Sequence, residues 1–141
     1  MVDTVASGYL RYCSFDFHRT SLLRLPAVFP LRPLALITSR RSPAKTLTYW
    51  HRPHTSKHRL PVLFVHGIGI GLYPYIDFLA ELNIENSMNE SDGEVGIIAV
   101  EIMCVSSRIT SEALEKEEMC QEIDRILKAH NWGKFVLVSH S

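Results

Sequence analysis

Residues 60–69 read Leu-Pro-Val-Leu-Phe-Val-His-Gly-Ile-Gly, an almost unbroken apolar run that ends in a histidine and two glycines. Apolar residues without polar alternation are typical of a strand that is buried on both faces, as in a parallel sheet. We therefore predict a buried strand over residues 60–65. The glycines that follow it predict a tight turn into the next element.

The segments downstream alternate between helix-like and strand-like patterns. Apolar residues follow a helical spacing at 74–83 and 112–130, and strand-like apolar runs occupy 96–102 and 134–138. Glutamates crowd the first turns of the second helix and Lys128 lies near its end, as the helix dipole favours. The order β-α-β-α-β predicts a parallel α/β sheet covered by helices, with right-handed crossovers.

The amino-terminal third of the chain lacks a clear period. Residues 1–45 mix aromatic residues, arginines and prolines, so we expect a basic, poorly structured leader before a domain at 46–141. Two short β-favouring runs, 34–38 and 46–50, flank a turn-rich link. This pattern predicts an N-terminal β-hairpin.

The net charge of zero conceals a division along the chain. Residues 1–60 hold ten Lys/Arg against two acids, and residues 61–141 hold five against thirteen, so the two parts carry +8 and −8. A basic arm can fold back on an acidic core, contact an anionic membrane surface, or simply be a solvated leader. Nucleic acid is not an expected partner, because no recognised binding motif accompanies the charge. Hydrophobic residues at 46% and charged residues at 21% exclude wholesale disorder and a fibrous protein.

The most apolar stretch, residues 22–37, is not expected to cross a membrane. Arg24 and Arg32 would each cost about 2.5–3.5 kcal/mol near a bilayer centre, and three prolines interrupt any helix there. No secretory signal is visible at the start of the chain. An odd number of cysteines without a Cys-x-x-Cys spacing favours reduced thiols and an intracellular setting; they are Cys13, Cys104 and Cys120.

The sequence Lys-Phe-Val-Leu-Val-Ser-His-Ser at 134–141 runs from a buried strand into a Ser-x-Ser. A serine at the tip of a sharp turn after a strand presents its hydroxyl at the edge of the sheet, and small residues two before and two after it keep that turn tight. Ser141 is thus the candidate nucleophile, and Ser139 is the small residue before it. The alternative is a polar, serine-rich turn without catalytic function.

The loop after the first buried strand carries the second candidate feature. Glycines directly after a strand let backbone N–H groups approach an oxyanion, and such groups stabilise a tetrahedral intermediate. The N–H of Ile68 is the preferred donor and that of Gly69 is a second candidate. His66 and Gly67 are expected to have structural roles, with His66 bracing the loop. The alternative is a glycine-rich turn that serves packing alone.

Together these motifs and the order of the elements resemble the α/β-hydrolase fold family, over residues 46–141. The resemblance implies an incomplete three-layer hydrolase fold, in which Ser141 attacks an ester-like carbonyl of a small-molecule substrate without a cofactor. It implies an oxyanion hole shared between the Ile68 N–H and the N–H of the residue after Ser141. In this family the acid and the base follow the nucleophile, so we expect a fragment of an esterase-like or lipase-like enzyme with negligible activity of its own. Ser139 stands where the family most often has glycine.

A second set of residues, three glycines and a glutamate, suggests dinucleotide binding as an alternative. Gly67, Gly69 and Gly71 lie between a strand and a helix, and Glu101 ends the next strand, as in a phosphate-binding turn with a ribose-binding acid. The third glycine comes one residue early, and Pro74 disturbs the start of the helix. A truncated, non-catalytic protein of the hydrolase fold is another alternative.

Three histidines in the polar loop have a His-x2-His-x3-His spacing that could hold zinc; they are His51, His54 and His58. No cysteine or carboxylate accompanies them, and lysine and proline lie between them. A solvated loop is the expected structure, and the sequence predicts no metal site.

Overall fold

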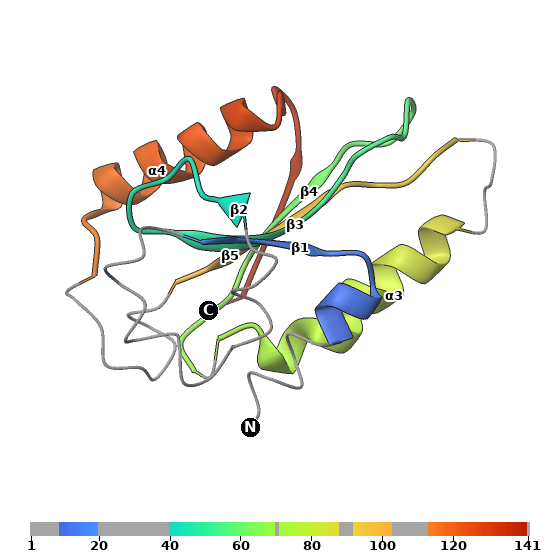
Figure 1. The fold of residues 1–141 in the computed structure, drawn as a ribbon, viewed down its shortest axis with the longest axis horizontal. Coiled ribbons are helices and arrows are strands. Elements are labelled where there is room, and N and C mark those ends of the chain that lie inside the picture. The colour runs from blue at the N-terminus through green and yellow to red at the C-terminus, as the bar shows by residue number, and fades with distance from the viewer. Residues whose placement is uncertain (1–8, 20–39, 70, 88–91, 103–112, 141) are drawn as a thin grey trace.

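The computed structural model describes residues 9–19, 40–69, 71–87, 92–102 and 113–140, with six strands in one mixed sheet (Figure 1). The order of the strands across the sheet is β2-β1-β3-β5-β4-β6. Their bounds are β1 Asp16–Arg19, β2 Arg40–Arg41, β3 Thr48–Arg52, β4 Val62–Val65, β5 Ile97–Glu101 and β6 Val136–Ser139. Strands β5, β4 and β6 are parallel neighbours, whereas β3 runs antiparallel to both β1 and β5.

Helices cover both faces of this open sheet (Figure 1). A 3-10 turn, η3 (Tyr73–Tyr75), leads into α3 (Ile76–Ser87), and α4 (Lys116–Ala129) lies on the opposite face. Leu72 and Leu79 pack with Phe64 and Trp50 on the α3 face, while Ile126 belongs to the core on the α4 face. The chain therefore forms three layers.

The end of α4 is set by local sequence. Asn131 adopts the left-handed conformation with φ of +59°, which asparagine tolerates better than most residues. The N–H of Trp132 donates to the Leu127 carbonyl and that of Asn131 to the Lys128 carbonyl, the pair of bonds of a Schellman motif. This motif fixes the position of His130, which caps the helix over the sheet.

The predicted β-α-β-α-β order is confirmed by β4, α3, β5, α4 and β6. The three strands of this segment, β5, β4 and β6, are parallel as predicted, and the antiparallel β3 between β1 and β5 makes the sheet as a whole mixed. The alternation from residue 60 onward predicts only the parallel part. The direction of β3 depends on the strands with which it pairs. The sequence of β3 and its close neighbours does not predict these partners.

The amino-terminal segment contributes to the fold more than its composition predicts. Within the expected leader, β1 is a strand of the sheet, and Leu10 and Phe15 are buried in the core on the α3 face. Strand β3 has β1 and β5 as its neighbours, so β3 is not the second strand of the predicted hairpin. The first strand of that hairpin, residues 34–38, and most of the rest of the expected leader lie outside the described residues, as does Cys104.

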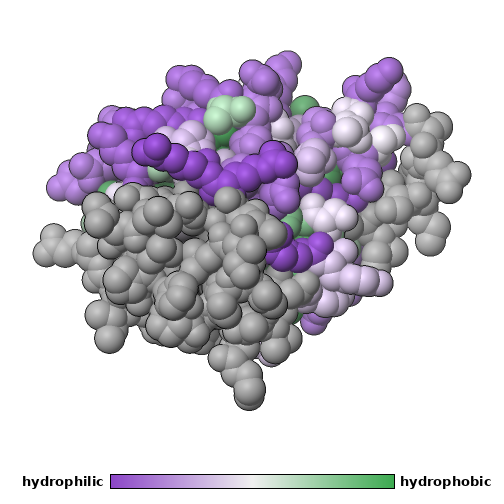
Figure 2. Space-filling view, in the orientation of Figure 1, coloured by the Kyte–Doolittle hydropathy of each residue, from purple (hydrophilic) through white to green (hydrophobic). Residues whose placement is uncertain are grey.

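The surface turned toward the viewer in Figure 1 is mostly hydrophilic where the structure describes it, with small apolar patches (Figure 2). Among the described residues, no helix combines the length and the apolar character needed to span a bilayer. Strand β6 lies at one edge of the sheet, where Val136 and Leu137 are exposed.

Candidate functional site

The connections after β4 and β6 begin at the same edge of the sheet, because the two strands are parallel neighbours. The crossover through α3 leads from β4 to β5 on one side, and the crossover through α4 leads back across β4 to β6 on the other. This reversal is a topological switch point, and ligands of open α/β sheets bind beyond the carboxyl ends of the strands at such a point. The loops after β4 and β6 therefore form the candidate site.

The end of β6 lies directly against the glycine loop. Ser139 is paired with Val65 in the register of β6 and β4, and the N–H of His140 donates to the Val65 carbonyl at 3.2 Å. A Cβ atom added to Gly67 would lie 2.8 Å from the carbonyl oxygen of His140. The structure thus brings the predicted oxyanion loop into contact with the residue before Ser141. Ser141 itself lies outside the described residues.

Alanine at position 67 should separate these two backbone segments. We expect Gly67→Ala to lower the free energy of unfolding by about 1–3 kcal/mol, the usual cost of forcing an extra carbon into a packed contact. Gly133→Ala is the matched control, because no atom lies within 4 Å of its added Cβ, and it should change stability little. Urea unfolding of both variants measures the difference. Equal stability of Gly67→Ala and the wild type would contradict the close approach.

His66 connects this loop to the end of β5. Its side chain is buried, and its Nε2 lies 2.9 Å from the backbone N–H of Ile102. Because a backbone N–H can only donate, Nε2 is the acceptor, and the neutral ring carries its proton on Nδ1. That proton is donated to the Gly67 carbonyl at 2.7 Å. Both ring nitrogens therefore hydrogen-bond to the backbone, as expected for a residue that braces the loop. A general base would need one ring nitrogen free to accept a proton from the substrate or the nucleophile.

Ile68 and Gly69 form the exposed part of the loop. The Ile68 side chain is 88% exposed, and within the described part of the chain its N–H donates to no acceptor. Gly69 has φ of +154°, a conformation that residues with side chains rarely adopt. An N–H without an acceptor, next to a glycine in this conformation, is suited to contact with an oxyanion.

Tyr75 is a residue of the site that the sequence patterns do not reveal. Its hydroxyl hydrogen-bonds to Nδ1 of His140 at 2.9 Å, and its ring packs against Phe64 with 5.0 Å between ring centroids. Tyr75 thus connects the core face of β4 to the residue after β6. Its signal in the sequence is weak, because an aromatic residue near the start of a helix most often serves only to pack against the core.

The residues of the dinucleotide alternative are placed differently. Gly71 is buried and has φ of +75°, and the 3-10 turn η3 separates it from the start of α3. A pyrophosphate site requires the glycine turn to lead straight to the helix N-terminus. Glu101 is 1% exposed, and its carboxylate accepts from the Thr48 hydroxyl at 3.4 Å. This placement does not favour a ribose contact.

The three loop histidines do not converge. Nδ1 of His54 accepts from the Gly96 N–H at 3.0 Å, and Nε2 of His58 lies 3.8 Å from the carboxylate of Asp92. His51 instead lies on β3, where its ring packs against that of His130 at a tilt of 31°, with 3.8 Å between centroids. The spacing of the three residues in sequence therefore does not describe their spacing in the fold.

Comparisons of the chain with protein-family models, with curated proteins and with solved structures found no match. The mixed, open α/β sheet with helices on both faces is established by the structure itself. The candidate chemical groups of the chain lie mainly in the segments after β4 and β6.

Proposed function

We propose that residues 46–141 are the amino-terminal part of a serine hydrolase domain of the α/β-hydrolase type that acts on carboxylic esters. The contact between Gly67 and His140 supports this proposal most directly. It joins the two backbone segments on which the chemistry depends, the loop with the oxyanion donor and the turn with the nucleophile.

Strands β4 and β6 are parallel neighbours, as the proposed ester hydrolysis requires of the strands before the oxyanion loop and the nucleophile. In the hydrolase arrangement, the nucleophile follows a strand on a sharp turn, and one oxyanion donor comes from a nearby loop between a strand and a helix. Here β6 leads into Ser141, and the loop between β4 and η3 provides Ile68. The pairing of Val65 with Ser139 sets these two connections side by side.

In the proposed reaction, Ser141 Oγ attacks the ester carbonyl and the carbonyl oxygen becomes an oxyanion. The Ile68 N–H and the N–H of the residue after Ser141 stabilise that charge, and the alcohol leaves as the acyl-enzyme forms. A base must take the serine proton, because a serine hydroxyl is otherwise a weak nucleophile. His66 is engaged with backbone on both nitrogens, and the order of this family puts the base after the nucleophile.

Labelling with a fluorophosphonate tests the proposal on protein expressed from its native reading frame. Where that frame supplies an acid and a base after residue 141, the label should be found on Ser141 by peptide mapping. Ser141→Ala should abolish labelling, whereas Ser139→Ala should retain it, because alanine is also small enough for the turn. A label on another serine would overturn the assignment. Absence of any label on a protein that has the acid and the base would overturn it as well.

A polypeptide ending at residue 141 provides the complementary measurement. It should turn over p-nitrophenyl butyrate no faster than buffer, because loss of one oxyanion donor alone costs about 10²–10³ in turnover and the base is lost as well. Turnover that disappears in Ser141→Ala would show that residues 1–141 contain a complete site, against this expectation.

A further inference from the structure

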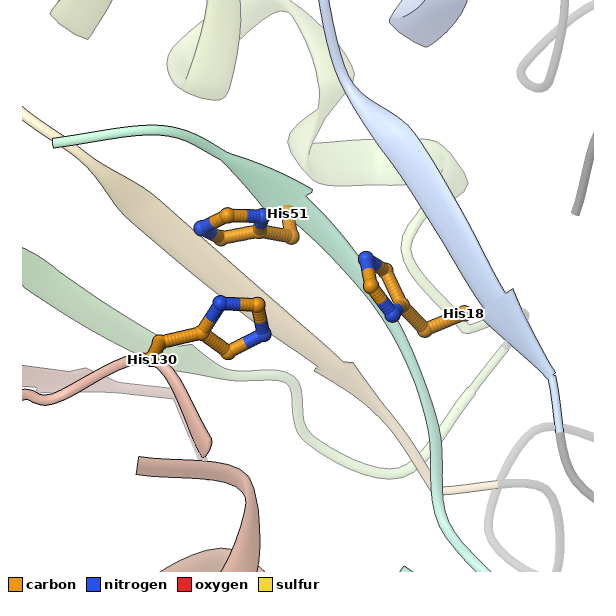
Figure 3. Close-up of side chains that lie close together, drawn as sticks. All are labelled: His18, His51 and His130. Atoms are coloured by element: carbon orange, nitrogen blue, oxygen red, sulfur yellow. The ribbon is translucent and has the colours of Figure 1, made fainter. Parts of the chain in front are cut away.

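Three histidines from separate parts of the chain meet on the α4 face of the sheet (Figure 3). His18 lies on β1, His51 on β3 and His130 directly after α4. Each ring offers one nitrogen that lies within 4.8 Å of the nitrogens offered by the other two. Three imidazoles at this spacing are a common ligand set for zinc in proteins.

Within the described part of the chain, the His18 ring contains a buried nitrogen that lacks a well-formed hydrogen bond. His18 is 6% exposed, and no described residue makes a well-formed hydrogen bond to its Nε2, although the Arg41 backbone lies near enough to the ring to raise its pKa slightly. Buried polar atoms are almost always hydrogen-bonded, so an orphaned ring nitrogen needs a physical reason. A metal ion bound among the three rings would provide it.

Burial also affects the electrostatics of the three rings. Burial lowers the pKa of His18 to about 4, helped by His130 and Arg40 and opposed by Asp16 and the Arg41 backbone. Burial likewise lowers the pKa of His51 to about 3, with smaller effects from His130, His18 and Arg40. The pKa of His130 is lowered by burial and by Arg40. Each of these shifts disfavours the protonated form of the ring.

Tyr49 holds two of the three rings in place. Its hydroxyl hydrogen-bonds to Nδ1 of His18 at 3.1 Å and to Nε2 of His130 at 2.9 Å, and its ring stacks on His18 with 4.4 Å between centroids. Burial raises the pKa of Tyr49 well above its ordinary value, so the hydroxyl stays neutral. Such outer partners orient the ligands of metal sites.

The cluster is looser than a loaded zinc site. Zn–N bonds of about 2.0–2.1 Å in a tetrahedron put neighbouring nitrogens about 3.3 Å apart, so the widest pair must approach by roughly 1.5 Å on this estimate. The nearby cation Arg40 opposes a dication, but it pairs with Asp16 at 3.5 Å, and its side chain is 71% exposed and free to turn toward solvent.

We propose that His18, His51 and His130 form a zinc-binding site, with a water molecule in the fourth position. The site connects β1, β3 and the end of α4, so the ion holds the amino-terminal strand to the rest of the domain. Strands β5 and β4 separate β3 from β6. The zinc site is therefore independent of the proposed esterase chemistry.

Titration of the metal-free protein with zinc, followed by calorimetry, tests this site. We expect one ion per chain with a dissociation constant in the micromolar range or tighter. His51→Ala should weaken binding at least about 100-fold through the loss of a ligand, and Tyr49→Phe about 10-fold or more through the loss of an outer partner. His58→Ala is the matched control: His58 is 84% exposed outside the cluster, so binding should be unchanged.

Cobalt provides a second readout that does not depend on calorimetry. Co²⁺ in the same site should give the visible absorption of a tetrahedral complex, and His130→Gln should remove it while the circular dichroism of the fold persists. If His51→Ala does not fold, His130→Gln decides the zinc titration as well. Binding no tighter than millimolar, or binding that survives loss of either ligand, would overturn the proposal and leave the cluster as aromatic packing.

Discussion

Phe64→Ala should lower the free energy of unfolding by about 3–5 kcal/mol, the range for removing a buried aromatic side chain. Phe64 is 2% exposed in the middle of β4. Its ring contacts Tyr75 and Phe78, with ring centroids 5.0 and 5.9 Å away. The cavity left by alanine would lie between the sheet and the segment that leads into α3.

Phe78→Ala is the matched control for this substitution. Phe78 is 39% exposed, so its removal takes less apolar surface from the core and should cost clearly less than Phe64→Ala. Urea unfolding of both variants gives the comparison. Loss of Phe64 should also free Tyr75, and with it His140, which two-dimensional NMR of the His140 ring would detect. Equal costs for the two phenylalanines would contradict the burial of Phe64.

Glu122→Ala should cost roughly 3 kcal/mol of stability, because it leaves three backbone N–H groups without their acceptor, each worth about 1 kcal/mol or more when buried. Glu122 is 4% exposed, and its carboxylate accepts from the N–H groups of Lys45, Thr46 and Leu47 at 2.8–3.0 Å. These bonds attach the segment before β3 to α4. Glu117→Ala, an exposed acid in the first turn of the same helix, should cost less than about 1 kcal/mol.

The same carboxylate should make stability depend on pH in acid. Burial raises the pKa of Glu122, but the hydrogen bonds from Thr46, Lys45 and Leu47 outweigh it and lower the pKa below the usual 4.5. A group with a lowered folded-state pKa stabilises the protein above its unfolded pKa and loses this effect as pH falls through the folded value. Unfolding free energy should therefore drop below about pH 4.5 in the wild type, and the drop should be smaller in Glu122→Gln. An identical acid profile for the two proteins would rule out this contribution.

The elements that the sequence predicts well are those whose patterns are local. Helices cover both faces of the sheet, so strand 62–65 is apolar on both of its faces. Its composition alone therefore predicts that the strand is buried. The apolar stripe of α4 follows from helical spacing, and the structure confirms it. Strand β1 escapes prediction because its four residues, Asp-Phe-His-Arg, are mostly polar and too few to show a pattern.

For the candidate site, the sequence locates the two loops and the structure joins them. The glycines after β4 and the serines at the end of β6 are recognisable by type and by their place after a strand. Tyr75 and the histidine cluster are not recognisable, because each depends on contacts between residues far apart in the chain. The His-x2-His-x3-His spacing even points to the wrong partners, since β3 directs His51 toward β1 and α4 while His54 and His58 lie in the loop that follows.

By itself the sequence determined where strands and helices form after residue 60, and which residue types stand at the ends of β4 and β6. Hydrophobic period, glycine conformation and helix termination are properties of a few neighbouring residues, so they can be read in order along the chain. Only the tertiary structure decided the antiparallel place of β3, the approach of Gly67 to His140, and the meeting of His18, His51 and His130. These depend on strand pairing across dozens of residues, which is set by the total burial and hydrogen bonding of the whole domain.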